Sequence, residues 1–219
     1  MIHPTAIIHP GVELGAGSRV GAYCVLGSEN GDPLLIGDDA VIRSHTVIYG
    51  GSDYGPNLET GHYTLLRSGN TVGVNLRIGS YASLEGRAQI GDYVRIHGRY
   101  EMTQGRVGHF AHLFGGTYVT DNRRPPSVAS ADAVPVIDDG AVVCMGVIVV
   151  AGVSVGVGAY VAGGVVVTAD VPDGHLLGRD GTLKRLRYFW PAHFAQAYPP
   201  EARPRLAALH ERMLALGGR

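Results

Sequence analysis

The hydrophobic side chains of this chain follow a six-residue period. Aliphatic residues occupy almost every sixth position in four runs, from Ile2 to Leu26, Ile36 to Met102, Val107 to Val119 and Ile137 to Val167. Tyr54 and Thr60 interrupt the residue type but keep the phase. Small or β-branched residues occupy most positions four residues after the aliphatic one. An α-helix repeats every ~3.6 residues and a strand every ~2, so neither explains the pattern.

A triangular parallel β-helix accounts for this period, because each segment of six residues supplies one short strand and one corner. Three segments close a coil, and the aliphatic residue and the small residue four positions later point inward. Glycine follows many of the aliphatic residues, and we expect it to permit the backbone conformation of the corner. About 26 segments give roughly nine coils, or ~40 Å of prism. The sequence therefore predicts an all-β solenoid whose terminal coils need covering.

Two interruptions break the period. Residues 27–35 are expected to form a short loop, and residues 121–136 a longer one. A long loop that leaves a regular solenoid is usually functional, although a plain surface loop is the alternative. The period ends near residue 173, so we expect a β-helix domain over residues 1–173 and a C-terminal cap over residues 174–219.

The C-terminal region has two predicted parts. Residues 175–190 are expected to be irregular or hairpin-like, with Asp180-Gly181 as a turn. Residues 201–216 predict an amphipathic helix with one apolar stripe, made of Leu206, Leu209, Met213 and Leu216. The stripe is expected to pack on the last coils or on a neighbouring subunit.

The composition excludes several classes of protein. The 33 glycines do not recur every third residue, which excludes collagen. The net charge of −1 provides no general attraction for nucleic acid or an acidic membrane. Cys24 and Cys144 lack the spacing of a zinc site or a disulfide framework. Without a long apolar run or a basic, apolar N-terminus, the chain is expected to be cytoplasmic, with no nucleic-acid or membrane partner.

The repeat resembles that of the hexapeptide-repeat acyltransferases, whose fold is a left-handed parallel β-helix. The opening residues 2–8 are similar to the first coil of the nucleotide-sugar acyltransferases of lipid A synthesis. The middle is more similar to N-acetyltransferases of nucleotide-linked amino sugars. The segments that carry this likeness are Ile42-Arg43-Ser44, Thr60-Gly61-His62, Arg95-Ile96-His97 and Thr120-Asp121-Asn122. The resemblance covers residues 2–173 and implies acetyl-coenzyme A as donor and a homotrimer with its groove between protomers.

The six-residue phase also places the polar side chains outside the core. Coils of 18 residues, or 17 near residues 102–107, stack one group in a single column at a corner: Glu59, Arg77, Arg95 and His112. His62 and His97 lie on the face that follows this corner. Asp92 falls beside His109, one coil apart or about 4.8 Å. One edge is thus expected to gather candidate catalytic groups near the loop at 121–136; ordinary exposed histidines are the alternative.

Acyl transfer from a thioester to an amine needs a base near pH 7, which histidine supplies. Residues 105–112 resemble the family segment beside the thioester, where the matching histidine is His112. The usual family base falls on Thr103, so His97 or His109 would replace it, or catalysis would rely on positioning. We expect Asp92 to fix the tautomer of His109. No catalytic cysteine is indicated.

The substrates have separate predicted sites. Residues 162–172 are similar to the coil that lines coenzyme A in the family, which implies donor contacts from Ala162, Gly163, Gly164 and Thr168. The later basic side chains, Arg179, Lys184 and Arg185, could bind its phosphates, although a solvated basic turn is the alternative. Substrate contacts are expected from His62, Glu59, Arg77 and Arg95. The loop residues Asp121, Asn122, Arg123 and Arg124 would contact the sugar or its diphosphate.

The leading interpretation is an acetyl-coenzyme A-dependent N-acetyltransferase for a nucleotide-linked amino sugar, acting by direct attack of the amine and without a metal. Acyl transfer to a hydroxyl or to another small amine is the first alternative. A γ-type carbonic anhydrase would need three histidines that converge between subunits. A non-catalytic trimeric scaffold is the remaining alternative.

Overall fold

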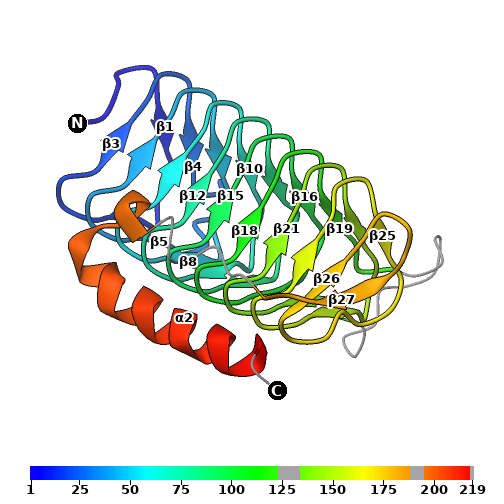
Figure 1. The fold of residues 1–219 in the computed structure, drawn as a ribbon. Helices are drawn as coiled ribbons and strands as arrows, with labels where there is room; N and C mark the ends of the chain where they lie inside the picture. Colours follow the sequence, from blue (N-terminus) through cyan, green and yellow to red (C-terminus); the bar gives the residue numbers. More distant parts are fainter. Residues whose placement is uncertain (123–133, 188–194, 218–219) are drawn as a thin grey trace.

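Three parallel sheets wind around one axis and form a prism (Figure 1). This computed structural model describes residues 1–122, 134–187 and 195–217. Successive strands join three sheets in turn, here named A, B and C, so up to β25 each strand pairs with the third strand before it. The predicted left-handed parallel β-helix of about nine coils with a short C-terminal helix is confirmed.

The strands are short, and all pairings but one are parallel. Sheet A contains β3 (Arg19–Val20), β6 (Val41–Ile42), β9 (Glu59–Thr60), β12 (Arg77–Ile78), β15 (Arg95–Ile96), β18 (His112–Leu113), β21 (Val142–Val143), β24 (Tyr160–Val161), β26 (His175–Leu177) and β27 (Leu183–Arg185). Sheet B contains β1 (Ile7–Ile8), β4 (Val25–Leu26), β7 (Val47–Ile48), β10 (Leu65–Leu66), β13 (Ser83–Leu84), β16 (Glu101–Met102), β19 (Tyr118–Val119), β22 (Ile148–Val149) and β25 (Val166–Val167). Sheet C contains β2 (Val12–Leu14), β5 (Leu34–Ile36), β8 (Ser52–Tyr54), β11 (Thr71–Val72), β14 (Ala88–Ile90), β17 (Gly105–Val107), β20 (Val136–Ile137) and β23 (Ser154–Val155).

The strand register follows the predicted coil lengths. Leu65 pairs with Ser83, eighteen residues later, whereas Ala88 pairs with Gly105 only seventeen residues later. The aliphatic positions point inward as predicted, and most of those in the middle coils are almost fully buried. Tyr54 and Thr60, which keep the phase without being aliphatic, are each only 1% exposed. The six-residue phase therefore gives both the register and the core.

Most glycines after the aliphatic residues serve a different purpose from the expected one. Gly37 does not have a positive φ, but a Cβ there would lie 2.6 Å from the backbone nitrogen of Pro56 in the next coil. Positive φ values occur two residues further on, as at Asn57 (60°) and Tyr93 (60°). The expectation that these glycines permit the corner conformation is therefore wrong for most of them, although Gly27 does have a positive φ of 90°. They permit the close approach of successive coils.

The C-terminal region departs from the prism. β26 extends sheet A, and β27 folds back on it as an antiparallel hairpin closed by a hydrogen bond from Gly178 N–H to Thr182 O. The short 3₁₀ helices η2 (Ala195–Ala197) and η3 (Pro200–Ala202) lead into helix α2 (Arg203–Gly217). Within the described residues, no helix combines the length and apolar character needed to span a membrane.

Helix α2 lies along the corner between sheets C and A (Figure 1). Its stripe behaves as predicted, because Leu206, Leu209 and Met213 are buried. They pack with Tyr93, Phe110 and Val157, which occupy this corner in different coils. The helix therefore runs beside the middle and later coils and does not sit only on the last ones.

Candidate functional site

The first candidate site is a groove of about 460 Å³ on sheet A, over β9, β12 and β15. We call it the arginine groove, after Arg43, Arg77 and Arg95, which line it. Glu59 also lines it from β9. His62, Ser80 and His97 line it from the corner between sheets A and B. Four predicted substrate residues and one predicted catalytic residue thus share one surface.

The predicted polar column is present. Arg77 pairs in register with Glu59 and with Arg95, and Arg95 pairs with His112. These residues lie within strands on the flat face of sheet A, so their predicted placement at a corner is wrong. Every third strand returns to the same sheet, and the residue before the inward aliphatic one therefore faces outward at the same place in each coil.

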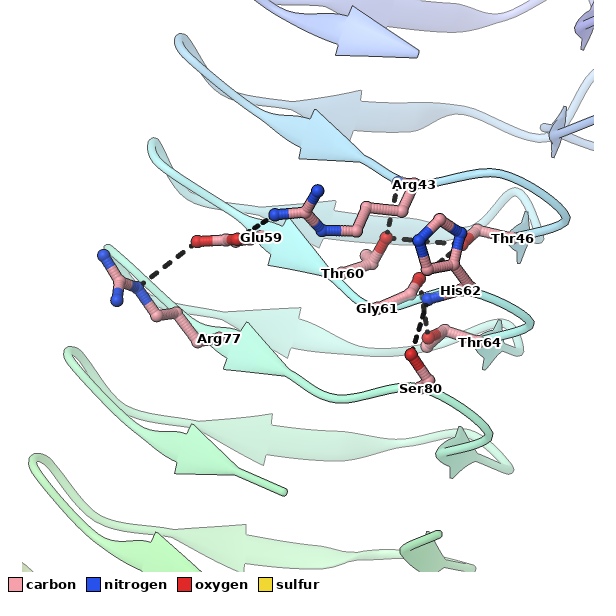
Figure 2. Close-up of polar contacts among 9 residues, drawn as sticks. All are labelled: Arg43, Thr46, Glu59, Thr60, Gly61, His62, Thr64, Arg77 and Ser80. Atoms are coloured by element: carbon pink, nitrogen blue, oxygen red, sulfur yellow. Dashed lines mark hydrogen bonds and ion pairs between the residues drawn. The ribbon is translucent and has the colours of Figure 1, made fainter. Parts of the chain in front are cut away.

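Glu59 links two arginines along this column. Its Oε1 lies 2.7 Å from Arg43 Nη2, and its Oε2 lies 3.4 Å from Arg77 Nε (Figure 2). All three side chains are partly exposed. Beside them, Ser44 Oγ and His62 Nδ1 lie 2.8 Å apart, and the backbone N–H of His62 donates to Ser80 Oγ at 2.9 Å. Polar groups therefore follow the groove through several coils.

Arg95 is held more firmly. Its Nη1 donates to the backbone oxygen of Asn75 and its Nη2 to the side-chain oxygen of Asn75, both at 2.7 Å. Its guanidinium lies 4.6 Å from the ring centre of Tyr198. Burial, together with the nearby charge of Arg77, lowers the pKa of Arg95 to about 10. No carboxylate lies at ion-pair distance from it among the described side chains.

His112 lies beneath the C-terminal segment and not in the groove. Its Nε2 is 2.7 Å from the hydroxyl of Tyr198. Burial, together with the charges of Arg95 and His97, lowers the pKa of His112 to about 4. A weakly basic ring whose Nε2 is already hydrogen-bonded does not suit the role of the base that takes the substrate proton.

His97 has the geometry that His112 lacks. It is exposed, lines the arginine groove and stacks on Phe114 with ring centres 4.3 Å apart. Partial burial lowers the pKa of His97, so its neutral form predominates at pH 7. A neutral imidazole open to a groove can accept a proton. Of the three predicted catalytic histidines, His97 alone lies in this groove.

Asp92 and His109 are neighbours, but not in the predicted way. His109 Nδ1 accepts the backbone N–H of Asp92 at 2.8 Å, although the carboxylate is also 3.4 Å away. The carboxylate accepts the N–H of Val74 and pairs with Arg205 of α2 at 2.8 Å. Although burial raises the pKa of Asp92, these contacts lower it overall. The Asp92 carboxylate therefore does not accept a hydrogen bond from Nδ1 of His109. Both residues instead contact Arg205 of α2.

The second candidate site is a groove of about 730 Å³ further along the prism. We call it the glycine groove, because Gly163 and Gly164 line it together with Ala162 and Arg179. These four were predicted donor-binding residues. Thr168, Lys184 and Arg185, also predicted for the donor, do not line it: Thr168 follows β25 of sheet B, and the other two lie in β27.

The sequence did not point to the other side chains of the glycine groove, Cys144, Met145 and Tyr160. A hydrogen bond with Cys144, together with burial, raises the pKa of Tyr160 to about 12. Tyr160 continues the outward column of Arg95 and His112 through Val142, so the phase could have identified it. Tyr198 has no such signal, because it lies outside the repeat.

The two grooves follow the same corner. His97 comes directly after β15, and Cys144 directly after β21, so two coils or about 10 Å separate the near ends of the grooves. Phe114 belongs to the coil between them. One face of the protein therefore carries a cationic groove and a glycine-lined groove in line, with His97 at the end of the arginine groove that faces the glycine groove.

The loop residues predicted to contact the sugar lie at a different corner of the prism. Asp121 and Asn122 follow β19 of sheet B and precede β20 of sheet C, so their corner is not the one that borders the arginine groove. Arg123 and Arg124 lie outside the described residues. The prediction that all candidate catalytic residues lie together at one edge near this loop is therefore wrong within a single chain.

In the described part of the chain, no three His, Cys, Asp or Glu side chains are placed to hold a metal ion.

Known proteins share both a sequence segment and the fold. No family model matches the chain. A segment of 56 residues is 39% identical to the acyl-[acyl-carrier-protein]–UDP-N-acetylglucosamine O-acyltransferase of Rickettsia canadensis, over 26% of this chain and 20% of that protein. A segment of 54 residues is 46% identical to the enzyme of the same name from Brucella ovis, over 25% of this chain and 18% of that protein. The match therefore spans about a fifth of these relatives.

Two solved structures share the fold over almost their full length. The LpxA acyltransferase of Bacteroides fragilis has a TM-score of 0.58 at 15% identity, covering 100% of this chain and 92% of that one. The polysialic-acid-specific acetyltransferase NeuO has a TM-score of 0.56 at 16% identity, covering 96% and 92%. The resemblance to the hexapeptide-repeat acyltransferases is confirmed.

Proposed function

We propose that this chain is an acyltransferase that moves an acetyl group from acetyl-coenzyme A to the amine of a nucleotide-linked amino sugar. The observation that carries the proposal is the alignment of the two grooves along one corner, with His97 at the end of the arginine groove nearest the glycine groove. The acceptor lies in the arginine groove, and the pantetheine arm lies in the glycine groove. Arg179 is the cation available there for a phosphate of the donor.

In the proposed reaction, the amine nitrogen attacks the thioester carbonyl directly. The C–N bond forms, the C–S bond breaks, and the thiolate of coenzyme A leaves. His97 accepts the amine proton and returns it to the sulfur. Because the acyl group passes straight between the two substrates, holding them in the right orientation supplies much of the rate.

We also propose a homotrimer, as the resemblance implies. A column of apolar side chains on sheet B supports this part of the proposal: Tyr118, Ile148 and Val166 pair in register and are 47%, 37% and 53% exposed. A continuous exposed apolar strip of this kind is typical of a protein interface. Light scattering coupled to size exclusion measures the oligomeric state, and a monomer would contradict this part.

The activity is tested by incubating the full chain with acetyl-coenzyme A and a panel of nucleotide-linked amino sugars. The expected result is release of free thiol that depends on both substrates, together with a product heavier by one acetyl group. A second candidate is transfer to a hydroxyl from an acyl carrier protein, which the names of the two sequence relatives favour. Turnover only with an acylated carrier protein and a hydroxyl acceptor would replace the first proposal with the second.

A further inference from the structure

The charges in the arginine groove do not balance. Arg43, Arg77 and Arg95 line it, whereas Glu59 is the single carboxylate among its lining residues. The groove is therefore cationic although the whole chain has a net charge of −1. A local excess of positive charge attracts an anionic ligand.

Glu59 is shared between two cations. It contacts Arg43 at 2.7 Å and Arg77 at 3.4 Å, and each contact uses one nitrogen of a guanidinium group that has five N–H donors. The side chains of these arginines are 46% and 53% exposed. Exposed ion pairs contribute little to stability, so a ligand can replace Glu59 at small cost.

We propose that Arg43 and Arg77 bind the diphosphate of the acceptor, and that Glu59 holds both guanidinium groups in place until the diphosphate displaces it. The proposal deepens the proposed function, on which it rests for the placement of the acceptor in this groove. Arg–phosphate contacts are commonly bidentate and charge-assisted, which makes them stronger than the contacts observed with Glu59.

The spacing favours a diphosphate over a single carboxylate. Arg43 lies two residues past the strand position in register with Arg77 and two coils away from it, about 12 Å in backbone terms, with Glu59 on the strand between them. One carboxylate already bridges this span, so a ligand with one carboxylate offers no advantage over Glu59. A diphosphate has two linked anionic groups and more acceptor oxygens, so it can contact both arginines at once.

The same spacing places the sugar toward the junction of the grooves. His97 is one coil beyond Arg77 and two residues past the strand position in register with it, about 8 Å away in backbone terms. A sugar ring attached to a diphosphate at Arg77 spans a distance of this order. The Arg43–Glu59–Arg77 cluster thus binds the part of the acceptor that does not react, and His97 meets the part that does.

The test measures binding to the full chain by isothermal titration calorimetry at low salt, with inorganic pyrophosphate and UDP as probes. Arg43→Gln and Arg77→Gln should each weaken both probes about tenfold, because a charge-assisted contact is lost. Glu59→Gln should tighten both probes several-fold, because it removes the competing charge but keeps the side-chain size. Arg106→Gln is the matched control, since Arg106 is a strand arginine on sheet C outside the groove.

Several outcomes would overturn the proposal. Unchanged affinity in Arg43→Gln and Arg77→Gln would place the anion elsewhere, and weaker binding by Glu59→Gln would show that Glu59 supports the ligand. Tighter binding of glucuronate than of pyrophosphate would assign the groove to a carboxylate. Calorimetry measures binding without turnover. If the variants change the affinities as expected but the chain transfers no acetyl group in the activity assay, the proposed function is refuted and the diphosphate site stands.

Discussion

Acidification should destabilise this protein through His112, whose ring is covered by Tyr198. The unfolded chain should titrate near the ordinary histidine pKa of ~6.5, whereas burial and the charges of Arg95 and His97 lower the folded pKa to about 4. The unfolded state therefore takes up the proton first. The stability contributed by neutral His112 is fully present above about pH 6.5, declines below it and is lost as the pH falls to the folded pKa. A single-site calculation gives a loss of about 2.5 kcal/mol between pH ~7.5 and pH ~4.5.

Urea unfolding of the wild type and of His112→Gln, followed by circular dichroism at both pH values, measures this loss. Other groups titrate in the same range, but both proteins share them, so the difference between the two pH-induced changes isolates His112. The wild type should lose about 2.5 kcal/mol more than the variant. Tyr198→Phe keeps the ring over Arg95 while removing the hydroxyl 2.7 Å from His112 Nε2, and it reports the share of that hydrogen bond. Equal losses in wild type and His112→Gln would refute the reasoning.

Three further predictions concern the reaction and the fold. His97→Ala should lower kcat about 100-fold, and unchanged turnover would exclude His97 as the base. Because the pKa of His97 is lowered, kcat/KM of the wild type should fall to half only below pH ~6.5. Arg179→Ala should raise KM for acetyl-coenzyme A several-fold in steady-state kinetics, whereas Lys184→Ala, outside the glycine groove, should not; equal effects would place the phosphates elsewhere. Gly37→Ala should lower the free energy of unfolding in urea by several kcal/mol, because its Cβ would meet the backbone of Pro56. Gly31→Ala, whose Cβ enters open space at a φ of +75°, should lower it by only about 1–2 kcal/mol. Equal losses would contradict the distinction between a glycine needed for close approach and one needed for positive φ.

The repeat made part of the site predictable. Glu59, Arg77, Arg95 and His112 pair in successive coils because every third strand returns to the same sheet, so sequence spacing converts directly into spatial proximity. His62 and His97 were placed beside them by the same reasoning, and both line the arginine groove. The roles proposed for these residues stay predictions until the substrates are identified.

Contacts from outside the repeat were not predictable in this way. Tyr198 lies 86 residues from His112, and no period connects the two positions. Its ring and hydroxyl cover part of His112 and pack against Arg95. Asp92 and His109 were predicted as a catalytic pair on the basis of their separation alone. The direction of the hydrogen bond between them depends on how the corner backbone presents its N–H groups.

The sequence by itself determined the three-sided coil, its register and its core, because a parallel β-helix repeats one local rule and each coil contacts only its neighbours. It also determined which polar residues share a column. Only the tertiary structure decided which of those residues remain open to a ligand. That choice depends on where the chain after the last coil packs, and helix α2 and Tyr198 cover one corner and leave His97 exposed. Packing between an irregular segment and a regular prism follows from the shape and chemistry of both surfaces, which no periodicity encodes.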